Sequence, residues 1–252
     1  MYGGEMRILI LTQVVVYPAD AGPKIKTLQV LRHLAAQHEV VYCTFVRNSQ
    51  ETRDVVHLRT ICRRVVTIPL HRSRLSDACF LLESLIRGDA FLLRRDERAA
   101  MHKAVERLLQ EEQIEVIHVD QLNMMRFAPI EWPGKIVLDE HNAVWQVVER
   151  LRERASNLFT RWLLSRELRI IRTLEEQACR RADRVLTVSE QDRASLYKLV
   201  GSDVPIVVVP ISLDVKEFDA KEKHHLVSDS RTRNRHRSDA NAAMVSLPHA
   251  DK

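Results

Sequence analysis

Short, continuous aliphatic runs alternate along this chain with longer segments of helical period, and this alternation limits the folds that the chain can adopt. Residues 7–13 read RILILTQ and residues 39–46 read EVVYCTFV, both typical of buried strands. Between them, residues 24–37 carry apolar side chains at helical spacing, among them Leu28 and Leu31. A strand, a helix and a second strand of these lengths predict a parallel βαβ unit.

The same alternation continues over most of the chain. Further strands are expected at 65–70, 115–119, 135–141, 184–189 and 206–210, and further helices at 75–87, 96–113, 143–181 and 191–200. Strands and helices that alternate in this way predict a Rossmann-like α/β fold, which is a doubly wound parallel sheet with helices on both faces. We expect this domain to occupy residues 1–219.

The remaining residues, 220–252, show no apolar periodicity. Residues 221–252 hold 7 Lys and Arg against 4 Asp and Glu, so they account for +3 of the formal net charge of +5. We expect them to form a disordered basic tail. The tail has no aromatic residue that could stack on a base, so a nucleic-acid partner is not expected.

The compartment is indicated by what the sequence lacks. No apolar run approaches the ~20 residues that cross a bilayer. The N-terminus has only Arg7 as a basic flank and no small-residue cleavage pattern of a signal peptide. The four cysteines are scattered, without metal-ligand spacing: Cys43, Cys62, Cys79 and Cys179. We therefore expect a cytoplasmic protein with reduced thiols and no metal site.

Four consecutive polar residues follow the aliphatic run at 136–138, and they are Asp139, Glu140, His141 and Asn142. Ligands of a doubly wound sheet bind outside the carboxyl ends of its strands, where these residues would lie. Carboxylates, an imidazole and an amide suit a polyhydroxylated ligand, and His141 could act as a base or position a ligand hydroxyl. The alternative is that Asp139 or Asn142 only caps the next helix.

Three further loops are expected at the same edge of the sheet. Gly22 would permit close approach to the first helix, whose N-terminus, with Lys24, could bind an anion, although an ordinary turn would also explain the glycine. Asp120 and Gln121 follow a strand in the same way as Asp139. Ser189 is a candidate for ligand binding that also fits the N-cap of the next helix. The chain shows no glycine fingerprint of nucleotide binding.

A basic helix with an apolar face is expected within residues 150–172, which contain seven arginines together with Leu158, Phe159 and Trp162. Such a helix could lie on an anionic membrane surface. It could equally pack on the sheet or against a second domain.

Four segments, in the expected order, carry a resemblance to a known family. They are the opening at 6–46, VLDEHNAVWQVVERL at 137–151, ADRVLTVSEQDRASL at 182–196 and VVVPISLDVKEF at 207–218. Over residues 6–219 the chain resembles the N-terminal half of family 4 retaining glycosyltransferases. The resemblance implies one half of a GT-B architecture, in which two Rossmann-like domains face each other across a cleft.

The roles of individual residues follow from this resemblance. The N-terminal domain of the family holds the acceptor, a glycan or a lipid-linked molecule, and the C-terminal domain binds most of the nucleotide-sugar donor. By position, Gly22 would approach the donor phosphates or the acceptor, and His141 would be the catalytic residue beside the transferred sugar. Asp139, Glu140 and Asn142 would line the cleft. The nucleotide-diphosphate sugar would be a co-substrate, and neither a cofactor nor a metal is expected.

The chain departs from the family pattern after this half. We expect the C-terminal donor-binding domain, and the acidic EX7E pair with it, to be absent from this chain. Glu167 and Glu175 have that spacing, but they lie in the predicted helix of the first half and are not a match. A frameshift near residue 231 is one hypothesis for the change of pattern.

We therefore expect the acceptor-binding half of a glycosyltransferase of polysaccharide or glycoconjugate synthesis, cytoplasmic or peripheral at the inner face of the membrane. We do not expect this chain to turn over alone. The alternative is a non-catalytic binding module that pairs with a separate donor-binding chain.

Overall fold

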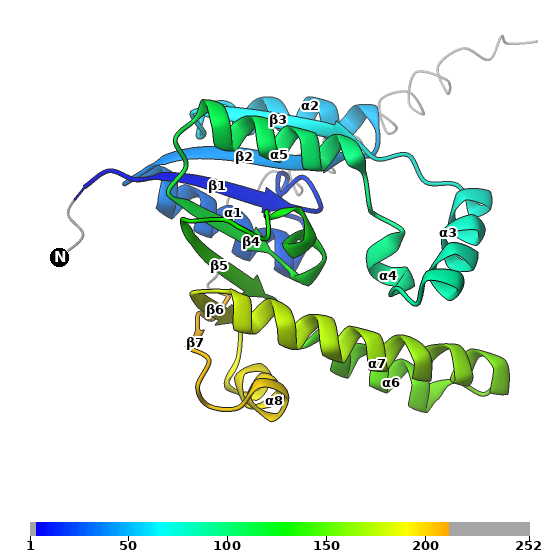
Figure 1. The fold of residues 1–252 in the computed structure, drawn as a ribbon. Coiled ribbons are helices and arrows are strands. Elements are labelled where there is room, and N and C mark those ends of the chain that lie inside the picture. Colours follow the sequence, from blue (N-terminus) through cyan, green and yellow to red (C-terminus); the bar gives the residue numbers. More distant parts are fainter. Residues whose placement is uncertain (1–3, 212–252) are drawn as a thin grey trace, which may run out of the picture. The chain divides into compact units, whose positions relative to one another are not determined.

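The computed structural model describes residues 4–211. Figure 1 shows the strands side by side in one twisted sheet, with helices in front of it and behind it. The expected domain boundary at residue 219 and the expected tail at residues 220–252 lie outside the described residues.

Seven parallel strands form the sheet in the spatial order β3-β2-β1-β4-β5-β6-β7. All neighbours pair in parallel, as the aliphatic runs predict, and Asp120 of β4 stands in register with Asp139 of β5. The strands are β1 (Arg7–Thr12), β2 (Glu39–Val46), β3 (Arg64–Pro69), β4 (Val116–Asp120), β5 (Lys135–Glu140), β6 (Arg184–Thr187) and β7 (Ile206–Val208). The Rossmann-like, doubly wound fold is thereby confirmed.

The connections between the strands are helical. They are α1 (Gly22–Ala35), α2 (Ser49–Leu58), α3 (Arg74–Arg87), α4 (Phe91–Arg94), α5 (Ala99–Glu111), the 3₁₀ helix η1 (Leu122–Phe127), α6 (Val144–Arg154), α7 (Leu158–Arg181) and α8 (Glu190–Val200). Three of these helices, α2, α4 and η1, were not expected from the sequence. α4 and η1 are too short to show a helical period.

The sheet buries an apolar layer on each face, because side chains alternate along every strand. On one face, Ile8 and Ile10 of β1 pack with Leu28 and Leu31 of α1 and with residues of α2. On the other face, Leu9 and Leu11 belong to a larger core shared with α5, η1 and α7. The expectation of helices on both faces is confirmed.

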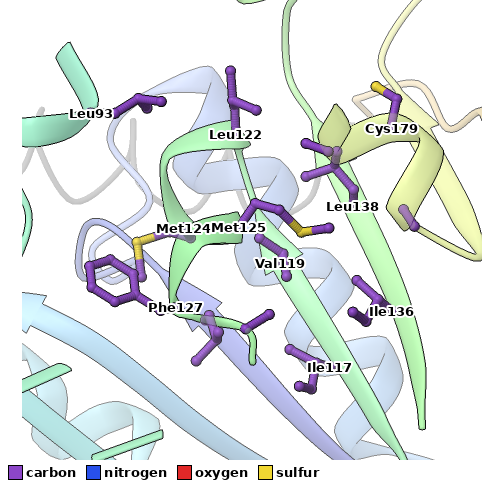
Figure 2. Close-up of a cluster of buried hydrophobic side chains, with 14 of the residues drawn as sticks. Leu93, Ile117, Val119, Leu122, Met124, Met125, Phe127, Ile136, Leu138 and Cys179 are labelled. Atoms are coloured by element: carbon purple, nitrogen blue, oxygen red, sulfur yellow. The ribbon is translucent and has the colours of Figure 1, made fainter. Parts of the chain in front are cut away.

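The helix η1 turns back over the end of β4 and closes the larger core there. Figure 2 shows Met125 beside Val119, with Phe127 and Met124 on the side away from β5. Phe127 is buried and meets the ring of Phe45 from β2 edge-on, with 5.8 Å between ring centroids. The loop after β4 is thus anchored by packing, which fixes the position of the residues that precede it.

The prediction of one long helix at 143–181 is wrong, because this segment forms two helices packed as a hairpin. α6 ends at Arg154 and α7 begins at Leu158. The physical reason is Asn157, whose side-chain oxygen accepts hydrogen bonds from the backbone N–H groups of Phe159 and Thr160 and so starts a new helix.

Two further expectations concern cysteines and membrane spans. All four cysteines are free thiols, three of them buried and Cys79 exposed. Among residues 4–211, every helix is too short or too polar to cross a bilayer.

Candidate functional site

The candidate site lies where the order of strands reverses. β1 stands between β2 and β4, so the connections from β1 run to one side of the sheet and the later ones to the other. In doubly wound sheets, ligands bind at the carboxyl ends of the strands beside such a reversal. The polar residues at the ends of β4 and β5 meet the first turns of α1 at this point.

A buried ion pair joins α1 to β5. The ammonium of Lys26 binds the Oδ1 atom of Asp139, and the two side chains are 2% and 0% exposed. His118 of β4 adds its Nε2 atom at 3.5 Å from Oδ2 of the same carboxylate. Burial alone would raise the pKa of Asp139, but hydrogen bonding and the charges of His118 and Lys26 outweigh it and lower that pKa to about 2. Asp139 is therefore an anion held by two cationic or polar partners.

A second chain of contacts runs beside this pair to His141. Thr27 of α1 donates its hydroxyl to Oδ1 of Asp120 at 2.8 Å, and Nε2 of His141 lies 3.0 Å from the same oxygen. The side-chain nitrogen of Gln121 lies 3.3 Å from Nδ1 of His141. The imidazole thus lies between the Asp120 carboxylate and the Gln121 amide.

Glu140 points to the opposite face of the sheet, because it follows Asp139 directly in the strand. There it meets Glu175 of α7, whose carboxylate accepts hydrogen bonds from the N–H groups of Val144 and Trp145 at 2.7 and 2.8 Å. Burial, and for Glu140 also the nearby charge of Glu175, raise the pKa of both carboxyls, that of Glu175 to about 7. Glu140 is therefore protonated at neutral pH, whereas Glu175, with a pKa of about 7, is about half ionised there.

The same contacts decide the question of the helix cap after β5. The alternative that Asp139 or Asn142 caps α6 is wrong, because Ala143 is the N-cap residue and receives no side-chain cap. Instead Glu175, from a different helix, binds the free N–H groups of the first turn of α6. None of the four polar residues at 139–142 therefore serves as the cap of α6.

The predicted site residues fall into two groups in the structure. Asp120, Asp139, Glu140 and His141 are buried and bound to each other or to neighbouring helices. Gly22, Lys24, Gln121 and Ser189 are half-buried at the edge, and Asn142 is exposed. Of the four polar residues at 139–142, only Asn142 presents its side chain to solvent, so the buried ones act in this structure by positioning. Direct ligand contact by any of them stays a prediction.

Two predicted residues also have local partners. Lys24 forms an ion pair with Asp20 at 2.9 Å, one turn away. Ser189 accepts a hydrogen bond from the N–H of Asp192 at 3.1 Å, which confirms it as the N-cap of α8. Neither contact is buried, so both side chains can exchange these partners for a ligand.

Sequence reasoning missed three residues of the site: Lys26, Thr27 and Glu175. Thr27 precedes the buried Leu31 by four residues, so helical spacing could have placed it on the inner face of α1. Lys26 gave no signal, because lysine is rarely buried. Glu175 lies on α7, far along the chain from Glu140 of β5, so no local sequence pattern indicates that the two residues meet.

The oxygens and nitrogens of Asp120, Asp139 and His141 lie close enough to suggest a cation site, with ligand atoms within 4.8 Å of one another. Lys26 already places its ammonium on Asp139, so a positive charge of the protein's own occupies this position. The residues therefore fit an internal ion pair better than a metal centre.

Comparison with known proteins places the chain in a family. The sequence model described as Glycosyltransferase Family 4 matches residues 26–217. No curated protein sequence matches the chain. Sucrose-phosphate synthase from Thermosynechococcus elongatus has a similar fold, with a TM-score of 0.54 and 15% identity over 84% of this chain and 49% of that one. The chain thus spans about half the length of that protein.

A plant protein shows a weaker likeness. UGT2 of Phytolacca americana, solved with UDP-2fluoro-glucose and pterostilbene, aligns with a TM-score of 0.48 and 11% identity over 82% of this chain and 54% of that one. The match to sucrose-phosphate synthase establishes the fold, and the family model establishes the family.

Replacing Lys26 tests whether the buried ion pair holds the site together. We expect Lys26→Met to lower the free energy of unfolding by about 3–5 kcal/mol, because it leaves the carboxylate of Asp139 buried without its cation. Lys24→Met, on the same helix at a partly exposed ion pair, should cost no more than ~1 kcal/mol. Urea unfolding followed by circular dichroism measures both.

A double variant guards against failure of the single variant to fold. Lys26→Met combined with Asp139→Asn removes both charges and should be more stable than Lys26→Met alone. Equal losses for Lys26→Met and Lys24→Met would show that the pair carries no special weight.

The raised pKa of Glu175 predicts how the stability of the protein depends on pH. Its folded pKa of about 7 lies above the ordinary value of 4.5. Between these values the unfolded chain loses a proton that the folded chain keeps, so the free energy of unfolding falls as pH rises, by about 1.4 kcal/mol per pH unit for one proton. Glu175→Gln should flatten this slope between pH 5 and 7, measured by urea unfolding at each pH.

The neighbouring Glu176 supplies the control, since it is partly exposed and pairs with Arg180 on the surface. Glu176→Gln should keep the wild-type slope. An unchanged slope in Glu175→Gln would mean that Glu175 is ionised in the folded protein.

Proposed function

Because the chain belongs to glycosyltransferase family 4, we propose that it is the acceptor-side half of a retaining glycosyltransferase. The complete enzyme would transfer a sugar from a nucleotide diphosphate to a hydroxyl of a glycan or lipid-linked acceptor, in the synthesis of a polysaccharide or another glycoconjugate. A second domain, or a partner chain, would complete the contacts to the donor. We place the protein in the cytoplasm.

This proposal rests on two features that lie close together at the carboxyl edge of the sheet. The first is the N-terminus of α1, which has no side-chain cap and no acidic residue in its first turn. Its free N–H groups and the positive end of its dipole favour an anion such as a diphosphate. The second is the oriented imidazole of His141, held beside Asp120.

Gly22 stands at the start of this helix and leaves room for a ligand. A Cβ atom built on Gly22 would meet only the Cδ1 atom of Ile211, at 3.9 Å. The fold therefore does not require glycine at this position. We propose that the ligand does, because a diphosphate that approaches the backbone N–H groups would collide with a side chain there.

In the proposed reaction His141 lies beside the transferred sugar. Its Nε2 atom lies 3.0 Å from Oδ1 of Asp120, so the ring is held beside this carboxylate. A ligand that displaces the Gln121 amide would leave Nδ1 of this fixed imidazole to accept a hydrogen bond from a sugar hydroxyl, without the reorganisation that a mobile side chain would need. The ammonium of Lys26 supplies the buried positive charge at this edge, which supports transfer without a metal ion.

A non-catalytic binding module remains the second candidate. The edge strand β7 exposes Val207, and Ile211 beyond it is also exposed. An open apolar edge of this kind suits a partner chain that continues the structure. Such a module would bind its partner without contacting a nucleotide sugar.

The binding site can be mapped on the chain itself. We expect millimolar UDP-glucose or GDP-mannose to shift the amide NMR signals of Gly22, Lys24, Asn142 and Ser189 in the ¹⁵N-labelled protein. Gly22→Ala should abolish these shifts and leave the free energy of unfolding within ~1 kcal/mol of the wild-type value, because the added methyl group fits the fold.

Gly4 provides the matched control, since a Cβ atom there meets nothing within 4 Å and the residue lies at the start of the described chain, before β1. Gly4→Ala should bind as the wild type does. Shifts confined to another face of the sheet, or shifts that survive Gly22→Ala, would contradict the assigned site. Absence of any shift would favour the binding module.

A further inference from the structure

Large apolar side chains are exposed at the tip of the hairpin made by α6 and α7. Leu158, Phe159 and Trp162, in the first turns of α7, are 82%, 65% and 56% exposed. The rings of Phe159 and Trp162 stack at 6.0 Å between centroids. Leu151 on α6 adds to the same end of the hairpin. A stacked aromatic pair held open to solvent is costly in water and indicates a surface that meets a partner.

The neighbouring helix α3 exposes a second apolar stripe. Leu75, Cys79, Leu82 and Ile86 follow one another at intervals of four, three and four residues, which places them on one helix face. All four are exposed, although such a stripe normally packs on a core. α3 thus presents an apolar stripe outward, while Ser84 on another side of the helix is buried.

Direct contacts join α3 to the hairpin, so the two apolar surfaces belong to one lobe. The guanidinium of Arg166, on α7, donates to the backbone carbonyls of Ser84 in α3 and of Asp89 just after it. Glu83 of α3 binds Arg94 of α4 at 2.7 Å. Glu167, next to Arg166, accepts hydrogen bonds from the first N–H groups of α4. We call the set α3, α4 and the α6–α7 hairpin the apical lobe.

The charge of the hairpin identifies the partner. Residues 144–172 hold seven arginines and three acidic residues, a formal net charge of +4. Arg154, Arg161 and Arg169 are exposed, and within the described part of the chain none of them forms an ion pair. Arginines without counter-ions beside exposed Trp, Phe and Leu match the composition of helices that lie in the interface of anionic membranes.

The same charge disfavours the other occupants of this surface. A second copy of the chain would bring two hairpins of like charge together, which is repulsive. Arginine and aromatic residues also occur together at protein interfaces, so the dimer outcome of the test below covers that occupant. We propose that the apical lobe docks the protein on an anionic lipid surface, with the Phe159–Trp162 pair inserted among the headgroups and the arginines paired with lipid phosphates.

The lobe is placed where such docking would serve the site. α6 starts directly after His141 and Asn142, and Figure 1 shows α3 and the α6–α7 hairpin extending past the ends of the strand arrows, on the same side as those ends. A docked protein would therefore hold the carboxyl edge of the sheet near the lipid. The use of this geometry for a lipid-linked acceptor rests on the proposed function, whereas lipid binding itself does not.

Sedimentation with vesicles tests the docking with the full chain. We expect the protein to bind vesicles of phosphatidylglycerol and phosphatidylcholine in a 1:3 ratio, and to bind pure phosphatidylcholine at least tenfold more weakly. Arg161→Gln and Arg169→Gln should each weaken binding about fivefold and reduce its salt dependence. The double variant Phe159→Ser/Trp162→Ser should weaken it about tenfold or more.

Ile130 offers the matched control, because it is 89% exposed but lies in the loop before β5, at the opposite edge of the sheet. Ile130→Ser should bind as the wild type does. All these side chains are on the surface, and circular dichroism would verify that each variant folds. The basic residues after 220 are unchanged in every variant, so they serve as an internal reference.

Three results would overturn the proposal. The first is no preference for phosphatidylglycerol, and the second is unchanged binding by the Phe159/Trp162 variant, which would assign lipid binding to another part of the chain. The third is a dimer in sedimentation velocity that the same variant dissociates, which would make the lobe a self-association surface. None of these results depends on the nucleotide-sugar shifts at Gly22, so the two proposals fail separately.

Discussion

The ion pair between Lys26 and Asp139 is the contact on which the site depends. It joins the first helix to the fifth strand across more than one hundred residues of sequence, in a place without solvent. A carboxylate buried without a partner costs several kcal/mol, so the register of α1 against β4 and β5 is tied to this contact. Thr27, one residue further, uses that register to hold Asp120, and Asp120 in turn faces His141.

A second set of carboxylates connects the site with the apical lobe. Glu167 and Glu175 lie eight residues apart on the inner side of α7, and each accepts two backbone N–H groups from the start of another helix. One therefore fixes α4 and the other fixes α6. Their spacing of about two helical turns matches a family signature by number alone. Here these glutamates have a structural task, and α7 acts as the frame to which site and lobe are attached.

The strands and most helices could be predicted from the sequence, because buried parallel strands are continuous aliphatic runs and surface helices show their period. The carboxyl-edge residues from Asp120 to Asn142 could be found for the same reason. The residues that contact this carboxyl edge could not be predicted from the sequence. Lys26 is a residue type that is rarely buried, and Glu175 approaches Glu140 only through the return of α7 across the sheet. The break between α6 and α7 depended on one side chain, Asn157.

The central claim is that the carboxyl edge beside α1 receives a nucleotide diphosphate without a metal ion between Asp120, Asp139 and His141. A crystal structure of the chain grown with UDP and Mg²⁺ tests it most directly. The account predicts the diphosphate at the N-terminus of α1, next to Gly22, with the ammonium of Lys26 still bound to Asp139. A diphosphate bound elsewhere, or a Mg²⁺ ion coordinated by those three side chains with Lys26 displaced, would contradict it.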